Sequence, residues 1–264
     1  MTTDLGALAS IAARKLREAE ALHCAAAGLW AKAETLAPAP DPATVLRGGA
    51  VIAEMKRRSP SGGQLRQALE PGPLARVYAG AGCAAISVLT DAPDFGGSLG
   101  DLAAVRDAVT LPVLRKDFTV DPVQVAEARV AGADWVLLIV AMLESTLLED
   151  CLDAVQRAGA GVVVEVHDEA QLERALIAGA PCIGINNRDL RTLRTDLDTF
   201  GRLRRLVPAA VTCVAESGVR DPADAARLVA EGADAVLVGE TLMRAPKPGA
   251  ELAAIVQAAR GAAA

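Results

Sequence analysis

Residues 131–140 read AGADWVLLIV, and variants of this phrase recur along the chain. They are AGCAAISVL at 81–89, AGAPCIGIN at 178–186 and EGADAVLVG at 231–239. In each variant, a glycine suits the left-handed position that ends a helix, and a short aliphatic run follows it. The phrase therefore predicts a repeating unit in which a helix ends, the chain turns tightly and a strand begins.

Eight strands of this kind can be placed along the chain, and they are apolar almost throughout. Such a pattern is typical of parallel strands whose two faces are both covered. Eight strand–helix units in 264 residues favour a closed (β/α)8 TIM barrel over an open doubly wound sheet. The absence of a GxGxxG motif after the first strand also disfavours a dinucleotide-binding fold. The predicted strands are 51–56, 84–89, 112–116, 135–139, 162–166, 182–186, 211–216 and 235–239.

Residues 1–46 precede the first barrel unit and form a predicted N-terminal helical extension, whereas 47–264 form the predicted catalytic barrel. Apolar residues recur at helical spacing in the first part of this extension, which predicts an extra helix. The Pro-rich stretch APAPDPA, beginning at Ala37, reads as a connector. We expect the extension to cap the barrel or to fold over its mouth.

Composition narrows the classes of partner. A net charge of −6 disfavours a nucleic-acid or anionic-membrane surface. The start of the chain has no signal-peptide pattern, and no apolar run reaches membrane length, so a cytoplasmic location is expected. The five cysteines form no CxxC pair and the two histidines lack partners at metal spacing. Free thiols and no bound metal are therefore expected.

Polar side chains gather at the carboxyl ends of the predicted strands, where barrel enzymes carry their active sites. A charged residue that simply faces water would be an ordinary explanation for a polar end on one strand. It does not explain why five strands carry a charge or an amide at the same end. Residues two apart on a strand share a face, so Glu54 and Lys56 should point the same way. The strand-end residues are Glu54, Lys56, Lys116, Glu165, Asn186, Glu216 and Ser217.

Two lysines and three glutamates in one cavity would have to pair, because unpaired buried charges are costly. Pairing keeps an ammonium protonated and suits a general acid. A Schiff-base lysine needs the opposite, a depressed pKa. The sequence leaves this balance open.

The loops after the last two strands read ESGVRDP and VGETLMR, and such loops often bind phosphate through backbone N–H groups. Ser217, Gly218 and Gly239 leave the backbone approachable there, and Lys56 and Arg188 could supply positive charge. The carboxylate of Glu240, beside Gly239, is expected to point away from a phosphate.

Aromatic residues make up only 2% of the chain, so Phe95 and Phe118 in loops at the barrel mouth suggest walls for a flat ligand. Trp135 and Cys213 are read as core residues. For His167 the favoured interpretation is structural, as part of a helix entry over 167–171.

Several of these stretches, in this order, resemble the motifs of the indole-3-glycerol phosphate synthase family. They are IAEMKRRSPSGG, AISVLTDAPDFGGSLGDL, LPVLRKDFTVDPVQV, VVVEVHDEAQL, IGINNRDLRTLRTDL, VAESGV and ADAVLVGETLM. The resemblance implies a carbon–carbon lyase of tryptophan biosynthesis. Its substrate, 1-(2-carboxyphenylamino)-1-deoxyribulose 5-phosphate, undergoes ring closure, decarboxylation and dehydration to indole-3-glycerol phosphate, and no cofactor or metal is implied.

The resemblance also implies roles for individual residues. Lys116 matches the lysine of ring closure. In dehydration, Lys56 is the expected acid and Glu165 the expected base, with Glu54 a contending base. Glu54, Glu216 and Asn186 would position the lysines and the substrate hydroxyls. The implied phosphate contacts are Arg188, Ser217, Gly218, Gly239 and Glu240, the implied anthranilate pocket is Phe95, Phe118, Leu137, Leu190 and Leu237, and Ser59 is a further substrate-binding residue.

One departure from the family concerns Glu240, which stands where many members carry a small hydroxyl residue. A phosphoribosyl isomerase, a Schiff-base aldolase and a ligand-binding protein without catalysis stay open as alternatives. The expected partner is a small sugar-phosphate bearing an anthranilate group, and the expected state is a monomer or weak homo-oligomer.

Overall fold

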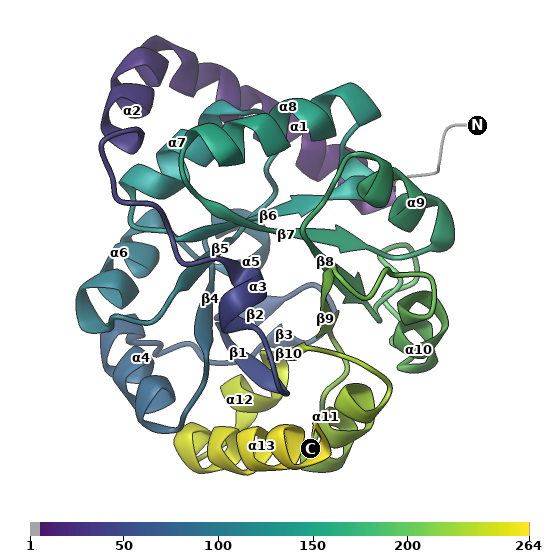
Figure 1. Cartoon of the computed structure of the whole chain (residues 1–264). Coiled ribbons are helices and arrows are strands. Elements are labelled where there is room, and N and C mark those ends of the chain that lie inside the picture. The colour runs from purple at the N-terminus through teal and green to yellow at the C-terminus, as the bar shows by residue number, and fades with distance from the viewer. Residues whose placement is uncertain (1–5, 264) are drawn as a thin grey trace.

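The computed structural model describes residues 6–263, and at its centre is a closed barrel of parallel strands (Figure 1). Their order around the barrel is β1-β10-β9-β8-β7-β6-β5-β4, and β4 pairs with β1 to close the ring. The predicted fold class is confirmed, and each predicted strand agrees with the observed one to within one residue. The barrel strands are β1 (Ala50–Met55), β4 (Ala85–Leu89), β5 (Val113–Lys116), β6 (Trp135–Ile139), β7 (Gly161–Val166), β8 (Cys182–Asn186), β9 (Thr212–Glu216) and β10 (Ala235–Val238).

A layer of helices surrounds the barrel and buries the outer face of every strand (Figure 1). Short helices also lie in the loops between strands and outer helices. The outer helices are α4 (Pro71–Gly80), α6 (Leu99–Ala108), α7 (Val123–Val130), α8 (Ser145–Arg157), α9 (Glu169–Ile177), α10 (Asp198–Arg204), α11 (Pro222–Ala230) and α13 (Pro248–Ala262). The loop helices are α5 (Ala92–Phe95), η2 (Val140–Met142) and α12 (Glu240–Arg244).

The interior of the barrel is filled by side chains of one strand parity. Ile52, Leu114, Val163 and Val214 belong to this interior cluster, and Trp135 is its largest fully buried member. Cys213, of the opposite parity, lies in the cluster between the strands and the outer helices. The core roles predicted for Trp135 and Cys213 are therefore confirmed.

The extension contains α1 (Gly6–Leu22), η1 (His23–Ala25), α2 (Ala26–Ala33) and α3 (Pro42–Val45). The 3-10 turn η1 divides the long helix that was expected, and residues 1–5 of the predicted extension lie outside the described part. The α2 helix packs along α7. None of the described helices is long and apolar enough to cross a membrane.

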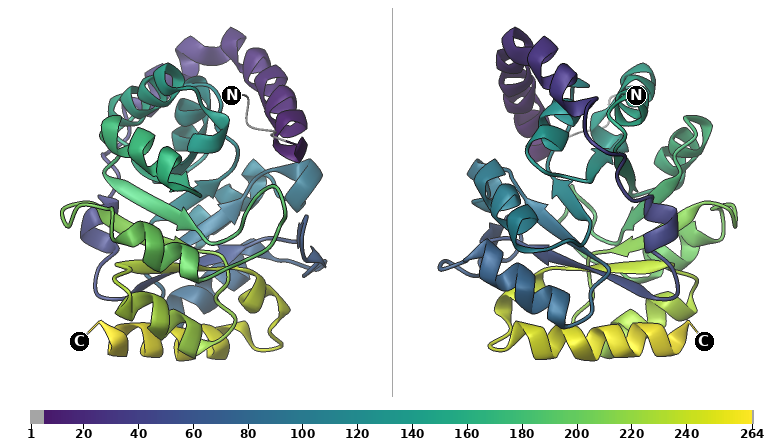
Figure 2. Two further views of the ribbon diagram at one scale, coloured as in Figure 1. Left: turned by 90° about the vertical axis from the view of Figure 1, so that its right-hand side faces the viewer. Right: turned by 60° about the vertical axis from the view of Figure 1, so that its left-hand side comes forward.

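The extension reaches both ends of the barrel. The α3 helix lies across the end where the strands begin (Figure 1), and Leu46 just after it joins the interior cluster. Before α3, the carbonyl of Pro40 accepts a 2.7 Å hydrogen bond from the buried Trp135 Nε1. At the opposite end, α1 lies beside the mouth with a small hairpin of β2 (Arg58–Ser59) and β3 (Gly63–Gln64) (Figure 2). The sequence predicted only a loop where this hairpin forms.

Candidate active site

A cavity of about 570 Å³ opens at the carboxyl ends of the strands. Every residue predicted for the site from the sequence lines it. For the residues at the strand ends the reason is strand parity, since residues two apart share a face. Ile52, Leu114 and Val163 point into the barrel. Glu54, Lys116 and Glu165 follow them by two residues each, so they point inward where the apolar filling ends.

Lys116 occupies the centre of the polar part of the cavity. Its Nζ lies 2.9 Å from Glu165 Oε2 and 2.7 Å from Glu216 Oε2. Asn186 Nδ2 donates a 3.0 Å hydrogen bond to the other oxygen of Glu165. The Glu165 and Glu216 side chains are almost completely buried, at 3% and 1% exposure, whereas 11% of the Lys116 side chain is exposed. The ammonium therefore has two carboxylate partners inside the protein and an accessible face.

The charges determine the protonation of this cluster. Burial disfavours the ammonium, but the attraction of Glu165, Glu216 and Glu54 outweighs it and raises the pKa of Lys116. Burial would also raise the pKa of Glu165, but Lys116 and His167 hold that pKa well below its ordinary value. For Glu216, burial prevails over the attraction of Lys116, and its pKa is raised to about 7. Lys116 therefore stays protonated at neutral pH, which disfavours the Schiff-base alternative.

A second ion pair joins Lys56 Nζ to Glu54 Oε1 on the neighbouring part of the wall. A Cβ atom added to Gly239 would lie 2.3 Å from Glu54 Oε1 and 3.1 Å from Lys56 Nζ. A Cβ atom at Gly184 would lie 2.2 Å from Glu216 Oε1. Glycine at these two positions makes room for the charged groups. The sequence analysis expected Gly239 to leave the backbone accessible to a phosphate. The close approach of Glu54 and Lys56 is a second reason for glycine at this position.

The lining of the cavity also has an apolar and partly aromatic component. The rings of Phe95 and Phe118 have their centroids 6.1 Å apart and are tilted by 41°. Leu137, Leu190 and Leu237 line the same cavity. Together they offer a flat aryl group an apolar surface of the kind expected from Phe95 and Phe118 in the sequence.

The loops after β8, β9 and β10 form the remaining side of the cavity. Ser217 and Gly218 have φ values of 63° and 93°, and the first is unusual for a residue with a side chain. Arg188 Nη2 lies 3.9 Å from Glu240 Oε2, and Glu240 also accepts a 3.0 Å hydrogen bond from Arg244 Nε. The Glu240 carboxylate therefore remains near Arg188 rather than turning out of the cavity.

A family model described as indole-3-glycerol phosphate synthase matches residues 13–255 of the chain. The chain belongs to the indole-3-glycerol phosphate synthase family. A protein of this name from Parafrankia sp. (strain EAN1pec) is 54% identical over 208 residues, which are 79% of this chain and 78% of that protein. Another from Nocardioides sp. (strain ATCC BAA-499 / JS614) is 56% identical over 201 residues, 76% of this chain and 77% of that protein.

Solved structures support the fold alone, since their sequences are distant. A chain titled "Native KDPGal structure" matches with a TM-score of 0.56 and 21% identity, covering 80% of this chain and 95% of that chain. The N-acetylmannosamine-6-phosphate 2-epimerase from Clostridium perfringens matches with a TM-score of 0.58 and 14% identity, covering 76% and 90% of the two chains. Both likenesses agree with the barrel of this indole-3-glycerol phosphate synthase family member.

Among the residues near the cavity that the sequence did not predict are two of α1 and the ring of His167. Leu8 and Ile11 of α1 line the cavity, although nothing in their local sequence indicates which barrel loops they meet. The His167 ring lies 3.2 Å from Glu165 Oε1, while its backbone N–H donates to Gln171 Oε1 at 3.0 Å. Asp168 caps α9 and the ring Nδ1 of His167 also lies 3.1 Å from Gln171 Oε1, so the helix-entry interpretation is confirmed. That interpretation did not include the contact of the ring with Glu165. His167 follows Glu165 by two residues, and this shared parity was the sequence signal that its ring could reach the barrel mouth.

The described residues contain no cluster of three or more His, Cys, Asp or Glu side chains suited to a metal ion. The carboxylates of the cavity are instead neutralised by lysine.

Proposed function

We propose that Lys116, Lys56 and their glutamate partners perform the reaction of the indole-3-glycerol phosphate synthase family. This chain is a carbon–carbon lyase of tryptophan biosynthesis and acts on a small-molecule substrate. The observation that carries the assignment of residues is the placement of Lys116. Its ammonium is held between Glu165 and Glu216 in a cavity whose lining also includes the two aromatic rings.

In the first step, the ring carbon that bears the carboxylate attacks the ketone carbon of the ribulose chain. A carbon–carbon bond forms and the ketone oxygen takes a proton. Lys116 donates this proton, because it is protonated and can stabilise the developing alkoxide. Loss of carbon dioxide from the same ring carbon then restores the aromatic ring and leaves a hydroxyl group on the new five-membered ring.

In the second step, this hydroxyl group leaves as water. We assign its protonation to Lys56, whose ammonium lies on the neighbouring wall beside Glu54. Glu165 removes the proton that must be lost to form the indole double bond. The depressed pKa of Glu165 keeps it ionised, which supports a role as base. Glu54 is the alternative base, and Asn186 orients Glu165 through its hydrogen bond.

Substrate binding follows the two sides of the cavity. The aryl group is assigned to the wall made by Phe95, Phe118 and the leucines, whose apolar surface it covers. The phosphate is assigned to the loops that contain Arg188, Ser217 and Gly218, with Lys56 and Ser59 on the adjoining loop. In this arrangement the ribulose chain spans the cavity and brings its ketone to Lys116.

We assign this activity to the cytoplasm and to a monomer or weak homo-oligomer that binds no nucleic acid. All five cysteines are free thiols, which supports a reducing compartment. The net charge of −6 supports the absence of a nucleic-acid partner.

An indole fluorescence assay tests the proposed function. Purified protein and the anthranilate-bearing ribulose phosphate should yield one indole product and one carbon dioxide per substrate. Borohydride added during turnover should trap no covalent adduct on Lys116, because the mechanism forms no imine between lysine and the substrate. Absence of indole product would contradict the function, and a trapped adduct would contradict the role of Lys116 as acid.

A further inference from the structure

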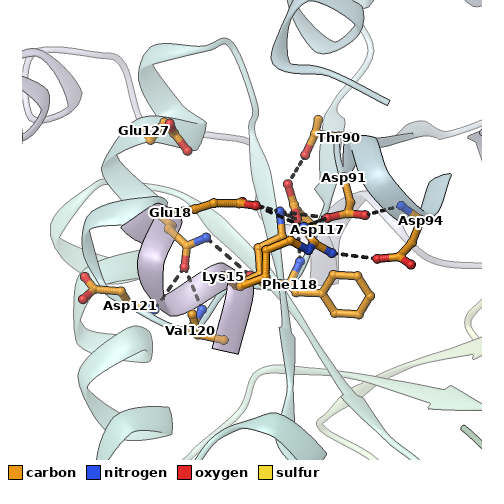
Figure 3. Close-up of polar contacts among 12 residues, drawn as sticks. Lys15, Glu18, Thr90, Asp91, Asp94, Asp117, Phe118, Val120, Asp121 and Glu127 are labelled. Carbon is orange, nitrogen blue, oxygen red and sulfur yellow. Dashed lines mark hydrogen bonds and ion pairs between the residues drawn. The ribbon is translucent and has the colours of Figure 1, made fainter. Parts of the chain in front are cut away.

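Lys15 of α1 is a buried cation in a part of the molecule that the proposed mechanism does not use. Its side chain is 4% exposed, and its Nζ lies 2.7 Å from Asp117 Oδ1 and 3.0 Å from Asp91 Oδ1 (Figure 3). Glu18 Oε2, on the same helix, lies 3.0 Å away. The three N–H groups of the ammonium therefore each have a carboxylate partner.

The two barrel aspartates of this cluster support the aromatic wall. Asp91 is the N-cap of α5, where its Oδ2 accepts a 3.0 Å hydrogen bond from the N–H of Asp94, and α5 ends with Phe95. Asp117 Oδ1 accepts a 2.8 Å hydrogen bond from the N–H of Phe118 (Figure 3). Lys15 thus contacts the backbone supports of both rings at once.

The same face of α1 reaches the cavity. Leu8, Ile11, Lys15 and Ala19 recur at helical spacing, and the first two line the cavity that also contains Phe95 and Phe118. Of the α1 residues whose burial is described, only Leu8, Lys15 and Ala19 are buried, and Leu16 is 53% exposed. With so little apolar burial, the position of α1 depends strongly on charge contacts.

Neighbouring contacts agree with this dependence. Arg14 adds ion pairs at 2.6 Å to both Asp91 and Asp94. Burial disfavours the ammonium of Lys15, but the attraction of Asp117 outweighs it and raises the pKa of Lys15. The cluster therefore stays charged at neutral pH and links one helix to two loops.

We propose that Lys15 is a positioning residue that holds α1 and the two phenylalanine loops together around the aryl group of the substrate. This inference rests on the proposed function, because its main readout is the Michaelis constant of that reaction. The proposal makes different predictions for the aryl end and the phosphate end of the substrate. Lys15 governs the fit of the aryl end and leaves the phosphate end unaffected.

Lys15→Met tests the proposal, because it keeps the length of the side chain and removes its charge. Asp91 retains Arg14 and Asp117 retains Arg115, so the carboxylates keep partners and the barrel should fold. We expect KM to rise about tenfold while kcat stays within about twofold. The affinity for anthranilate, measured by calorimetry, should fall by a similar factor. The inhibition constant of inorganic phosphate should not change.

Two further variants make the result decisive. Lys32→Met removes an exposed lysine of α2 and should leave KM unchanged. Asp91→Asn keeps an N-cap acceptor for α5, weakens the contacts with Lys15 and Arg14, and should raise KM as Lys15→Met does.

Equal losses of anthranilate and phosphate binding would overturn the proposal, as would an unchanged KM in Lys15→Met. Loss of a cooperative thermal transition in both Lys15→Met and Asp91→Asn would also overturn it, because the cluster would then stabilise the barrel itself. If the parent enzyme made no indole product, the proposed function would fail instead. Anthranilate binding would still report on Lys15 in that case.

Discussion

At the scale of single residues, the site depends on matching each buried charge with another. Lys116 is paired with Glu165 and Glu216, and Lys56 with Glu54. Removing one partner of such a pair leaves an uncompensated buried charge. The cost of that unpaired charge in folding free energy is far larger than the cost of burying the intact pair. Substitutions within this set should therefore affect protonation and position together, and the variants below separate the two effects.

Lys56→Arg keeps the charge but replaces a compact ammonium with a planar, larger group. We expect kcat to fall about a hundredfold or more, because a guanidinium is a poor proton donor at neutral pH. The measurement is indole formation at saturating substrate, with Lys32→Arg as a control on the protein surface. If Lys56→Arg has the kcat of the parent, Lys56 acts only through its charge.

Gly239→Ala introduces a methyl group where Glu54 Oε1 would be 2.3 Å away. The Glu54–Lys56 pair must move, and a displacement of about 1 Å can cost a hundredfold in rate. We expect kcat/KM to fall by about that factor while the thermal transition stays cooperative. Gly80→Ala, where a Cβ meets nothing within 4 Å, is the matched control. Parent-like kinetics in Gly239→Ala would show that the pair is free to move.

Glu216 should produce an inflection in the pH profile of kcat/KM near pH 7, where its raised pKa lies. As the pH falls through about 7, Glu216 takes up a proton, Lys116 loses one charged partner and kcat/KM declines. Glu216→Gln should abolish this inflection. Its persistence in the variant would assign it to another group.

The same shift has a consequence for stability, with the sign set by linkage. A carboxyl group whose pKa is raised on folding stabilises the folded state most below its ordinary value of 4.5. This contribution is lost as the pH rises through about 7. As the pH rises from 4.5 to about 7, the free energy of unfolding should therefore decline less for Glu216→Gln than for the parent.

At the scale of elements, the extension has two attachments with different effects. The α1 helix meets the cavity through Leu8 and Ile11, whereas the connector before α3 is bonded to the other end of the barrel. There, Trp135 Nε1 donates to the carbonyl of Pro40 and Arg129 Nη2 donates to that of Ala37. The helix should therefore affect binding, and the connector should affect folding.

Two truncations separate these effects. Deletion of residues 1–35 removes α1 and α2 but keeps the connector, so we expect a higher KM with a cooperative thermal transition. Deletion of residues 1–40 also leaves the buried indole N–H of Trp135 without its acceptor, which should cost about 1–3 kcal/mol more in unfolding free energy. The measurements are KM and circular dichroism melting. A parent-like KM after deletion of 1–35 would remove α1 from substrate binding.

Element boundaries show how far local patterns suffice. The barrel strands were predicted to within one residue because apolar runs between turn signals mark them directly. The break at η1 was missed, since a 3-10 turn differs from an α-helix in its hydrogen bonds rather than in its residue types. The β2–β3 hairpin was read as a loop. It depends on a φ of +62° at Gly63 and on the N–H of Gly62, which donates to Ser59 Oγ.

At the scale of the whole molecule, the closed barrel brings the inward-pointing residues at the ends of its strands into one cavity. Residues as far apart as Lys116 and Glu216 meet because all eight strands run in one direction and end at the same rim. This is why the sequence predicted the strand-end residues of the cavity. The cluster of Lys15 could not be predicted, because its aspartates lie on strand-end loops distant in the chain. Which loops α1 meets depends on tertiary packing.

The central claim is that Lys116 is the acid of ring closure, and Lys116→Met tests it most directly. The measurements are indole formation under single-turnover conditions and the dissociation constant of indole-3-glycerol phosphate for the folded variant. We predict that turnover falls by at least about a hundredfold while product binding stays within about tenfold of the parent. Turnover close to that of the parent in Lys116→Met would contradict the account.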